Sequence, residues 1–180
     1  EYLPLRGIAK ETLRKYEVKT KIDAEGKPVE VGFIYPNQSV KVRSLTNKTF
    51  FWKENGETHE PGLFGRDRFS SGEHRYVVIT EGEFDALTLH QVLRVPVVSV
   101  QSSATGVRDC ISDRAFLNGF ERVYLALDND QPGKECAAGI AKLFDFNKVY
   151  QVKFDKYKDA NDYLQAGEGP ELLNLWTNAP

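Results

Sequence analysis

This chain is organised around two apolar runs that each end in carboxylates: Tyr76-Val77-Val78-Ile79-Thr80 before Glu81-Gly82-Glu83-Phe84-Asp85, and Arg122-Val123-Tyr124-Leu125-Ala126-Leu127 before Asp128-Asn129-Asp130. Short runs of β-branched and aromatic residues are typical of strands covered on both faces, and such strands usually belong to parallel sheets. Apolar residues at helical spacing follow each run. The alternation predicts an α/β fold with a central, mainly parallel sheet flanked by helices.

Carboxylates follow both predicted strands at the same end. In open α/β sheets the ligand site lies beyond the carboxyl ends of the strands, where we expect Glu81, Asp128 and Asp130. Carboxylates gathered there would raise one another's pKa unless a cation neutralised them, and a hard divalent metal is the simplest such cation. Taken alone, the Asp128-x-Asp130 pair has another interpretation, because aspartates before a Pro-Gly turn are often turn formers.

Three motifs occur together in the chain, namely Glu81-Gly-x-x-Asp85-Ala-Leu, Asp128-x-Asp130-x-x-Gly-Lys134 and Lys158-Asp159-Ala160-Asn161-Asp162. This combination resembles the Toprim domain shared by primases and topoisomerases. Shorter phrases resemble the RNA-polymerase domain of phage-type primase-helicases, namely Arg6-Gly7-Ile8, Lys41-Val42-Arg43 and Leu63-Phe64-Gly65. The resemblance spans most of the chain and implies a Toprim fold.

The resemblance implies a DNA-dependent RNA primase, which makes short oligoribonucleotides from NTPs on a single-stranded DNA template during replication. It implies that Glu81, Asp128 and Asp130 are catalytic, and that Mg²⁺ or Mn²⁺ is held by Glu81, Asp85, Asp128, Asp130 and Asp159. For Asp159 a helix cap is the alternative role. A helicase domain and a zinc-binding module would lie outside this chain.

In residues 18–52 apolar side chains recur with a period of two, and turn residues separate the runs. This pattern predicts a small antiparallel sheet before the parallel one. We expect residues 1–74 to form this N-terminal subdomain and residues 75–180 to form the Toprim catalytic domain. The helical pattern of residues 109–117 predicts one crossover helix. His59 and His74 lack metal-ligand spacing, and we expect both at the surface.

Basic and aromatic residues alternate within the predicted small sheet. Lys41 and Arg43 share one face of a strand, which we expect to face solvent. Bases near aromatic residues are typical of a surface that binds phosphates and stacks bases, but we expect at least two of the three residues 50–52 to form the core of the small sheet. The resemblance favours nucleotide or DNA binding by Lys41 and Lys48, with Arg43 and Lys134 as further phosphate contacts.

Composition sets limits on the class of protein. A hydrophobic fraction of 41% argues against disorder, and the chain lacks the run of about 20 apolar residues that a membrane helix needs, so we expect no membrane partner. The formal net charge of -2 does not favour nucleic-acid binding unless bases gather away from the acidic site. Cys110 and Cys136 have no C-x-x-C partner, which argues against a zinc site or a disulfide framework. We therefore expect the protein to work in a reducing compartment, the cytoplasm of a bacterial or phage-infected host cell. The absence of methionine suggests a piece of a longer protein.

Two other classes of function stay open. The chain can be a single-stranded-DNA-binding platform of a replicative helicase that does not prime. It can also be a Toprim nuclease or a topoisomerase fragment, although no strand-cleaving tyrosine is evident. Incubation with template, NTPs and a divalent metal separates these functions, because the products would be oligoribonucleotides, bound DNA only, or nicked DNA.

Overall fold

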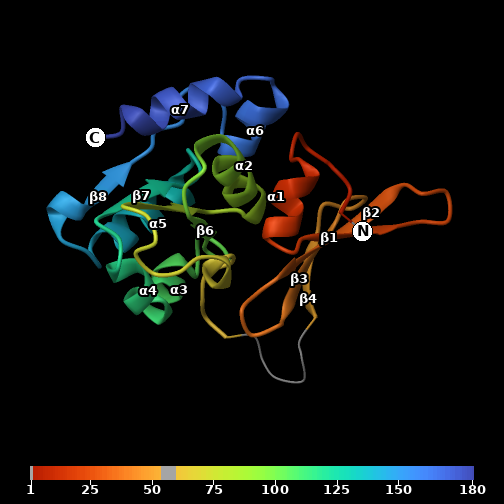
Figure 1. Cartoon of the computed structure of the whole chain (residues 1–180), viewed down its shortest axis with the longest axis horizontal. Helices are drawn as coiled ribbons and strands as arrows, with labels where there is room; N and C mark the ends of the chain where they lie inside the picture. Colours follow the sequence, from red (N-terminus) through yellow and green to blue (C-terminus); the bar gives the residue numbers. More distant parts are fainter. Residues whose placement is uncertain (1, 54–59) are drawn as a thin grey trace.

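The computed structural model describes residues 2–53 and 60–180, and these residues form two four-stranded sheets (Figure 1). The first sheet is antiparallel in the order β1-β2-β3-β4, with strands Lys19–Ile22, Pro28–Ile34, Val40–Ser44 and Phe50–Lys53. The second sheet is parallel in the order β6-β5-β7-β8, with strands Val97–Ser99, Tyr76–Thr80, Arg122–Ala126 and Val149–Gln151. The predicted α/β architecture with a preceding antiparallel sheet is confirmed.

Two groups of helices flank the parallel sheet (Figure 1). In one group α2 (Glu83–Leu93), α6 (Ala160–Gln165) and α7 (Gly169–Thr177) pack together, with α1 (Lys10–Lys15) against α2. In the other group α3 (Gly106–Ser112) contacts α4 (Arg114–Asn118) and α5 (Gln131–Ala141). The single crossover helix expected at residues 109–117 is wrong, because two short helices, α3 and α4, stand in its place with Asp113 between them at a φ of -103° and a ψ of 23°. The Asp113 carboxylate accepts a 2.7 Å hydrogen bond from the Leu63 N–H.

The segment between the sheets is tied to the parallel sheet by backbone hydrogen bonds. Phe64 and Ser99 form an antiparallel bridge with N–H···O distances of 2.9 and 3.1 Å. Gly65 adopts a φ of 81°, and a Cβ atom there would lie 2.7 Å from the Tyr16 ring, so this position requires glycine. The Tyr16 hydroxyl donates a 2.7 Å hydrogen bond to the Val97 carbonyl. The Leu63-Phe64-Gly65 phrase therefore attaches the N-terminal part to the edge of the parallel sheet. A short 3₁₀ turn, Arg66–Arg68, follows it.

The inner face of the antiparallel sheet packs against the start of α2. Val31 and Phe33 are fully buried, and the Phe33 and Phe84 rings meet edge to face at 5.1 Å. Cross-strand pairing places Lys41 opposite Phe33 and Arg43 opposite Val31, so both basic residues lie on this inner face. The expectation that Lys41 and Arg43 face solvent is therefore wrong, because strand alternation defines two faces but not which one is covered.

The aromatic residues of β4 are more exposed than predicted. Phe50 is 45% exposed and Phe51 is 41% exposed, and within this trio only Trp52 is partly buried against the core. The expectation that at least two of these residues form the core is wrong, because β4 is the last strand of its sheet and is not covered like β2 or β3.

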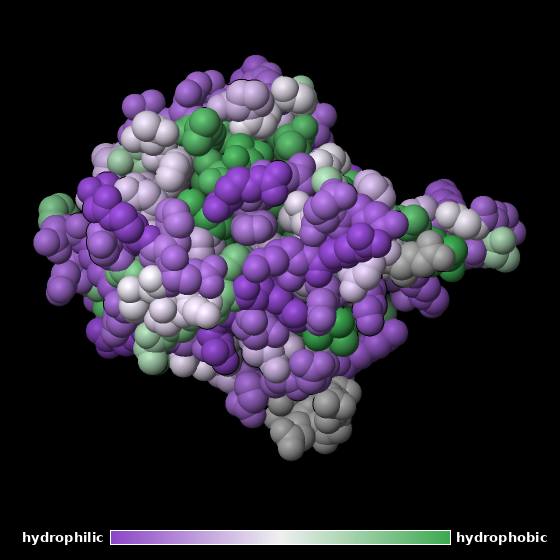
Figure 2. All heavy atoms as spheres, viewed as in Figure 1, coloured by the Kyte–Doolittle hydropathy of each residue, from purple (hydrophilic) through white to green (hydrophobic). Residues whose placement is uncertain are grey.

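The outer surface is largely hydrophilic on the face shown in Figure 2, with an apolar area in its upper part, and the hairpin of β1 and β2 projects from the body (Figures 1 and 2). His74 is exposed, as expected, and His59 lies outside the described residues. None of the helices in residues 2–53 and 60–180 has both the length and the apolar character needed to cross a bilayer.

Candidate functional site

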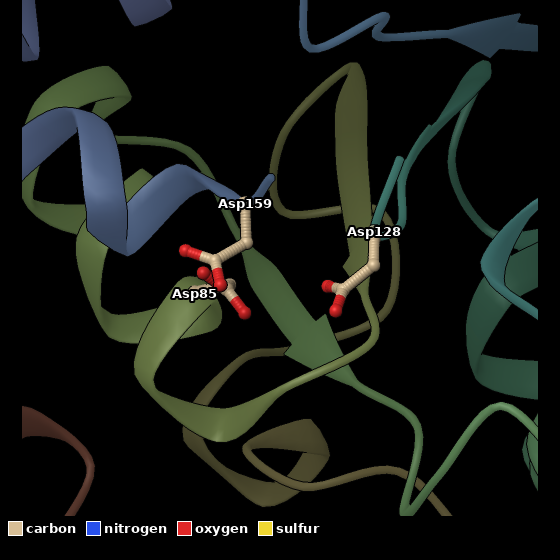
Figure 3. Close-up of side chains that lie close together, drawn as sticks. All are labelled: Asp85, Asp128 and Asp159. Atoms are coloured by element: carbon tan, nitrogen blue, oxygen red, sulfur yellow. The ribbon is translucent and has the colours of Figure 1, made fainter. Parts of the chain in front are cut away.

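Three aspartates from distant parts of the chain meet at the carboxyl end of the parallel sheet (Figure 3). Asp85 lies in the first turn of α2, Asp128 follows β7, and Asp159 immediately precedes α6. One carboxylate oxygen of each residue lies within 4.8 Å of the others. The convergence follows from the sheet order: β5 and β7 are parallel neighbours, so the segments after both strands begin at the same edge, and α6 packs against α2.

The cluster is electrostatically strained because its members are partly or fully removed from water. Asp85 is 7% exposed, and burial raises its pKa well above the usual range of an aspartate, with the charge of Asp159 raising it further. Burial also raises the pKa of Asp128, against the opposing effect of Lys158. One Asp85 oxygen accepts a 2.9 Å hydrogen bond from the Asn161 N–H, so this carboxylate has a fixed orientation. A bound cation would relieve the repulsion.

Asp159 combines the two roles that were considered for it. One of its oxygens accepts a 2.9 Å hydrogen bond from the Asp162 N–H and so caps α6. The same carboxylate is a member of the three-aspartate cluster. The cap therefore orients the side chain toward Asp85 and Asp128 and does not compete with a place in the cluster.

Lys158 provides the positive charge nearest to this cluster in the described chain. Its ammonium lies 2.9 Å from an Asp128 oxygen and 3.2 Å from an Asp130 oxygen, and these two contacts raise its pKa. The sequence motif that contains Lys158 suggested the family resemblance but no role for the lysine itself. Its pairing shows that part of the negative charge of Asp128 is balanced within the protein.

Asp130 and Glu81 lie beside the cluster and are not members of it in the described chain. Asp130 caps α5 by accepting a 3.0 Å hydrogen bond from the Gly133 N–H, and this bond holds its pKa below the usual value. A Glu81 oxygen accepts a 3.3 Å hydrogen bond from the Asp128 N–H. Glu81 is half-buried, and burial together with the charge of Asp128 raises its pKa. A Cβ atom at position 133 would lie 2.3 Å from the Asp128 carbonyl, which explains the glycine of the motif.

The cluster lies in a cleft of about 610 Å³ between the two sheets. Acids line this cleft, namely Glu81, Glu83, Asp85, Asp128 and Asp159. Bases and aromatic residues line the same cleft, namely Arg6, Lys41, Arg43, Lys158, Phe50, Phe84 and Trp52. The polar loop after β6 adds Gln101, Ser102, Ser103 and Thr105. Acids and bases are thus gathered in one cleft although the net charge of the chain is only -2.

Lys41 is held by internal contacts at the base of this cleft. It is 8% exposed, its ammonium lies 2.7 Å from a carboxylate oxygen of buried Glu83, and it donates a 2.6 Å hydrogen bond to the Gln101 carbonyl. The Tyr35 hydroxyl donates a 2.8 Å hydrogen bond to the same Glu83 oxygen. Lys41 therefore links the antiparallel sheet to the parallel-sheet part of the molecule.

Two arginines present positive charge to the cleft, where they feel the charges of nearby carboxylates but form no ion pair with any of them among residues 2–53 and 60–180. The Arg6 guanidinium lies 4.5 Å from the Phe84 ring centroid, and the Arg43 guanidinium lies 4.9 Å from that of Phe50. Burial lowers the pKa of Arg43, and the charge of Arg6 lowers it further. Arg6 was not among the predicted site residues, although the Arg6-Gly7-Ile8 motif was one of those that carried the family resemblance.

Lys48 and Lys134, which were also expected to bind nucleotide or DNA, do not line this cleft in the described chain. Lys48 is exposed in the turn between β3 and β4, where its φ is 56°. Lys134 is exposed on α5 and borders a different hollow beside Phe146. Their predicted roles have no support from the geometry of the cleft.

Comparisons with known proteins agree with this architecture. A Toprim-like family model matches residues 78–164. The DNA helicase/primase of enterobacteria phage T3 is 30% identical over 181 residues, covering 98% of this chain and 31% of that protein, so the chain spans about a third of that relative's length. The primase fragment of the bacteriophage T7 primase-helicase has a TM-score of 0.85 at 27% identity, covering 98% of this chain and 74% of that one.

A second solved structure contains primase domains bound to an RNA/DNA hybrid and dTTP, in contact with the phage T7 lagging-strand DNA polymerase. It has a TM-score of 0.83 at 27% identity and covers 99% of this chain and 92% of that one. The similarity therefore includes the antiparallel sheet as well as the Toprim-like region.

Proposed function

Since the chain contains a Toprim-like domain and matches the primase fragment of a phage primase-helicase over nearly its whole length, we propose that it is the RNA-polymerase domain of a phage-type primase-helicase. It would join NTPs into short oligoribonucleotides on a single-stranded DNA template, and the helicase domain would lie outside this chain. The observation that carries the proposal is the convergence of Asp85, Asp128 and Asp159 in a cleft that also contains Arg6 and Arg43.

The donor set suits a hard divalent cation. Three carboxylates offer only oxygen ligands, which Mg²⁺ and Mn²⁺ prefer, and their mutual repulsion favours a bound cation. Asp85, Asp128 and Asp159 would hold the metal, and Glu81 and Asp130 would lie beside it. When bound, the metal would stabilise charge on the attacking and leaving oxygens of a displacement at the α-phosphate.

Glu81 is our candidate for the group that accepts the proton of the attacking 3′-hydroxyl. Burial and the charge of Asp128 raise the pKa of Glu81 above its usual value, which makes its carboxylate a stronger base than an exposed glutamate. Its hydrogen bond from the Asp128 N–H fixes its carboxylate next to the cluster. A second role, as a further metal ligand, stays open for this residue.

Arg6 and Arg43 would bind phosphate oxygens of the nucleotide or the template. Neither forms an ion pair with a carboxylate in the described part of the chain, and both guanidiniums lie against aromatic rings that restrict their motion. Guanidinium groups form paired, charge-assisted hydrogen bonds with phosphate. The acids of the cleft would thus hold the metal, and the arginines would hold phosphates of the same reactants.

The test is synthesis of oligoribonucleotides from labelled NTPs on single-stranded template with Mg²⁺ or Mn²⁺. We expect Asp128→Asn to reduce synthesis about 100-fold or more while template binding without metal is retained. Asp145→Asn is the matched control, because Asp145 is an exposed aspartate outside the cleft. Full synthesis by the Asp128 variant would reject the assignment. Nicked DNA, or binding without any product, would reject priming in favour of a nuclease or a binding platform.

A further inference from the structure

Phe50 is a large apolar side chain that remains open to solvent on the wall of a polar cleft. It is 45% exposed and begins β4, the edge strand of the antiparallel sheet. It pairs across the sheet with Arg43 and shares that face with Trp52, which also lines the cleft. Because β4 ends its sheet, no further strand in the described chain covers this ring, and an apolar face is left available within the cleft.

Basic groups hold the Phe50 ring in place. The Lys41 ammonium lies 4.7 Å and the Arg43 guanidinium 4.9 Å from its ring centroid. Lys41 is itself fixed by Glu83 and by the Gln101 carbonyl, so its position under the ring is restricted. The Arg43 guanidinium also lies 5.8 Å from the Phe84 ring, and Arg6 lies 4.5 Å from the same ring. Aromatic rings and guanidiniums therefore alternate along this wall.

This arrangement fits a flat, π-bonded group that is attached to phosphate. A nucleobase can stack on an open aromatic face, and the adjacent guanidiniums can bind the phosphates on either side of it. An apolar peptide segment would need a larger exposed apolar surface, because, of the aromatic residues that line the cleft, Phe84 is buried, Trp52 is half-buried and Phe50 alone is exposed. We propose that Phe50 is a stacking platform for a nucleobase, supplied either by the single-stranded template or by the incoming nucleotide.

The proposal rests on the proposed function, since it names a contact of the same cleft with the same substrates. The chain offers a matched control in Phe51. This residue is the same in type and is 41% exposed, and a lysine ammonium lies 5.7 Å from its ring, but it points to the opposite face of β4 and does not line the cleft. Comparing alanine variants at the two positions therefore separates the loss of any exposed phenylalanine from the loss of the stacking platform.

The experiment measures binding of the whole chain to a labelled oligothymidylate by fluorescence anisotropy and to ATP by equilibrium dialysis, both without divalent metal. We expect Phe50→Ala to raise the Kd of one of these ligands about 5- to 150-fold, which corresponds to one lost stacking contact. A change for the oligonucleotide alone identifies a template base, and a change for ATP alone identifies the base of the nucleotide. Phe51→Ala should leave both affinities within about twofold.

Two further comparisons separate stacking from a general loss of structure. Phe50→Tyr should retain most of the affinity and Phe50→Leu should not. If the template supplies the base, an abasic strand of the same length should bind the wild type and the Phe50→Ala chain equally. Equal effects of the Phe50 and Phe51 alanine variants, or no effect on either ligand, would overturn the proposal.

These outcomes are independent of catalysis. If the wild-type chain synthesises oligoribonucleotides while Phe50→Ala binds both ligands normally, the platform is rejected and the proposed function stands. If the wild type makes no product and the Phe50-dependent binding is present, the platform stands and the primase assignment fails.

Discussion

Replacing Lys41 with methionine tests whether this lysine links the two sheets or contacts nucleic acid. The substitution keeps a long apolar side chain and removes the ammonium that lies 2.7 Å from Glu83. The Lys41 and Glu83 side chains are 11% and 3% exposed, so the remaining carboxylate would stay buried with only the Tyr35 hydroxyl as a described hydrogen-bond donor. Removing one partner of a buried ion pair costs about 3–5 kcal/mol.

For a chain of this length, we expect the Lys41→Met variant to unfold about 6–20 °C below the wild type in thermal melts followed by circular dichroism. Adding Glu83→Gln removes the unpaired charge and keeps an acceptor for Tyr35, so the double variant should be more stable than Lys41→Met alone. Lys48→Met is the control, because Lys48 is exposed in a turn and its loss should change stability by at most about 0.5 kcal/mol.

The same variants are compared for DNA binding over a range of salt concentrations. A lysine that contacts phosphate contributes about one unit to the slope of log affinity against log salt, whereas a lysine held inside the protein contributes little. A stability loss below about 1 kcal/mol together with a slope reduced by about one would refute the linking role. It would support direct template binding by Lys41.

Three further predictions concern the cleft. Because burial and Asp159 raise the pKa of Asp85, the stability linked to its protonation is present at low pH and lost as pH rises through the raised pKa. Without metal, the melting temperature of Asp85→Asn should therefore be higher than that of the wild type at pH 7 and equal to it near pH 4 or below. A difference in melting temperature that does not change with pH would contradict this. Lys158→Met should raise Mn²⁺ affinity about three- to tenfold in calorimetry, because its ammonium competes for Asp128; weaker binding would count against competition. Arg43→Gln should weaken oligothymidylate binding and lower the salt slope by about one, and an unchanged slope would remove Arg43 as a phosphate ligand.

Local sequence patterns were sufficient to predict the order of helices and strands and the end of the parallel sheet where the acids gather. Apolar runs such as residues 76–80 and 122–126 depend on side chains a few positions apart, so periodicity reveals them without knowledge of the rest of the chain. Carboxylates that follow parallel strands must lie at the same end of the sheet, and this rule already brought Glu81 and Asp128 near each other, where the structure joins them by a hydrogen bond.

Which side chains meet, and which faces are covered, depended on packing between segments far apart in the chain. Asp159 reaches Asp85 because α6 packs on α2, whereas Asp130 is turned toward the first turn of α5, which it caps. Strand alternation placed Lys41 and Arg43 on one face, but only the contact between the sheets makes that face the inner one. Phe50 and Phe51 are exposed because β4 ends its sheet, and a two-residue period contains no information about the position of a strand within a sheet.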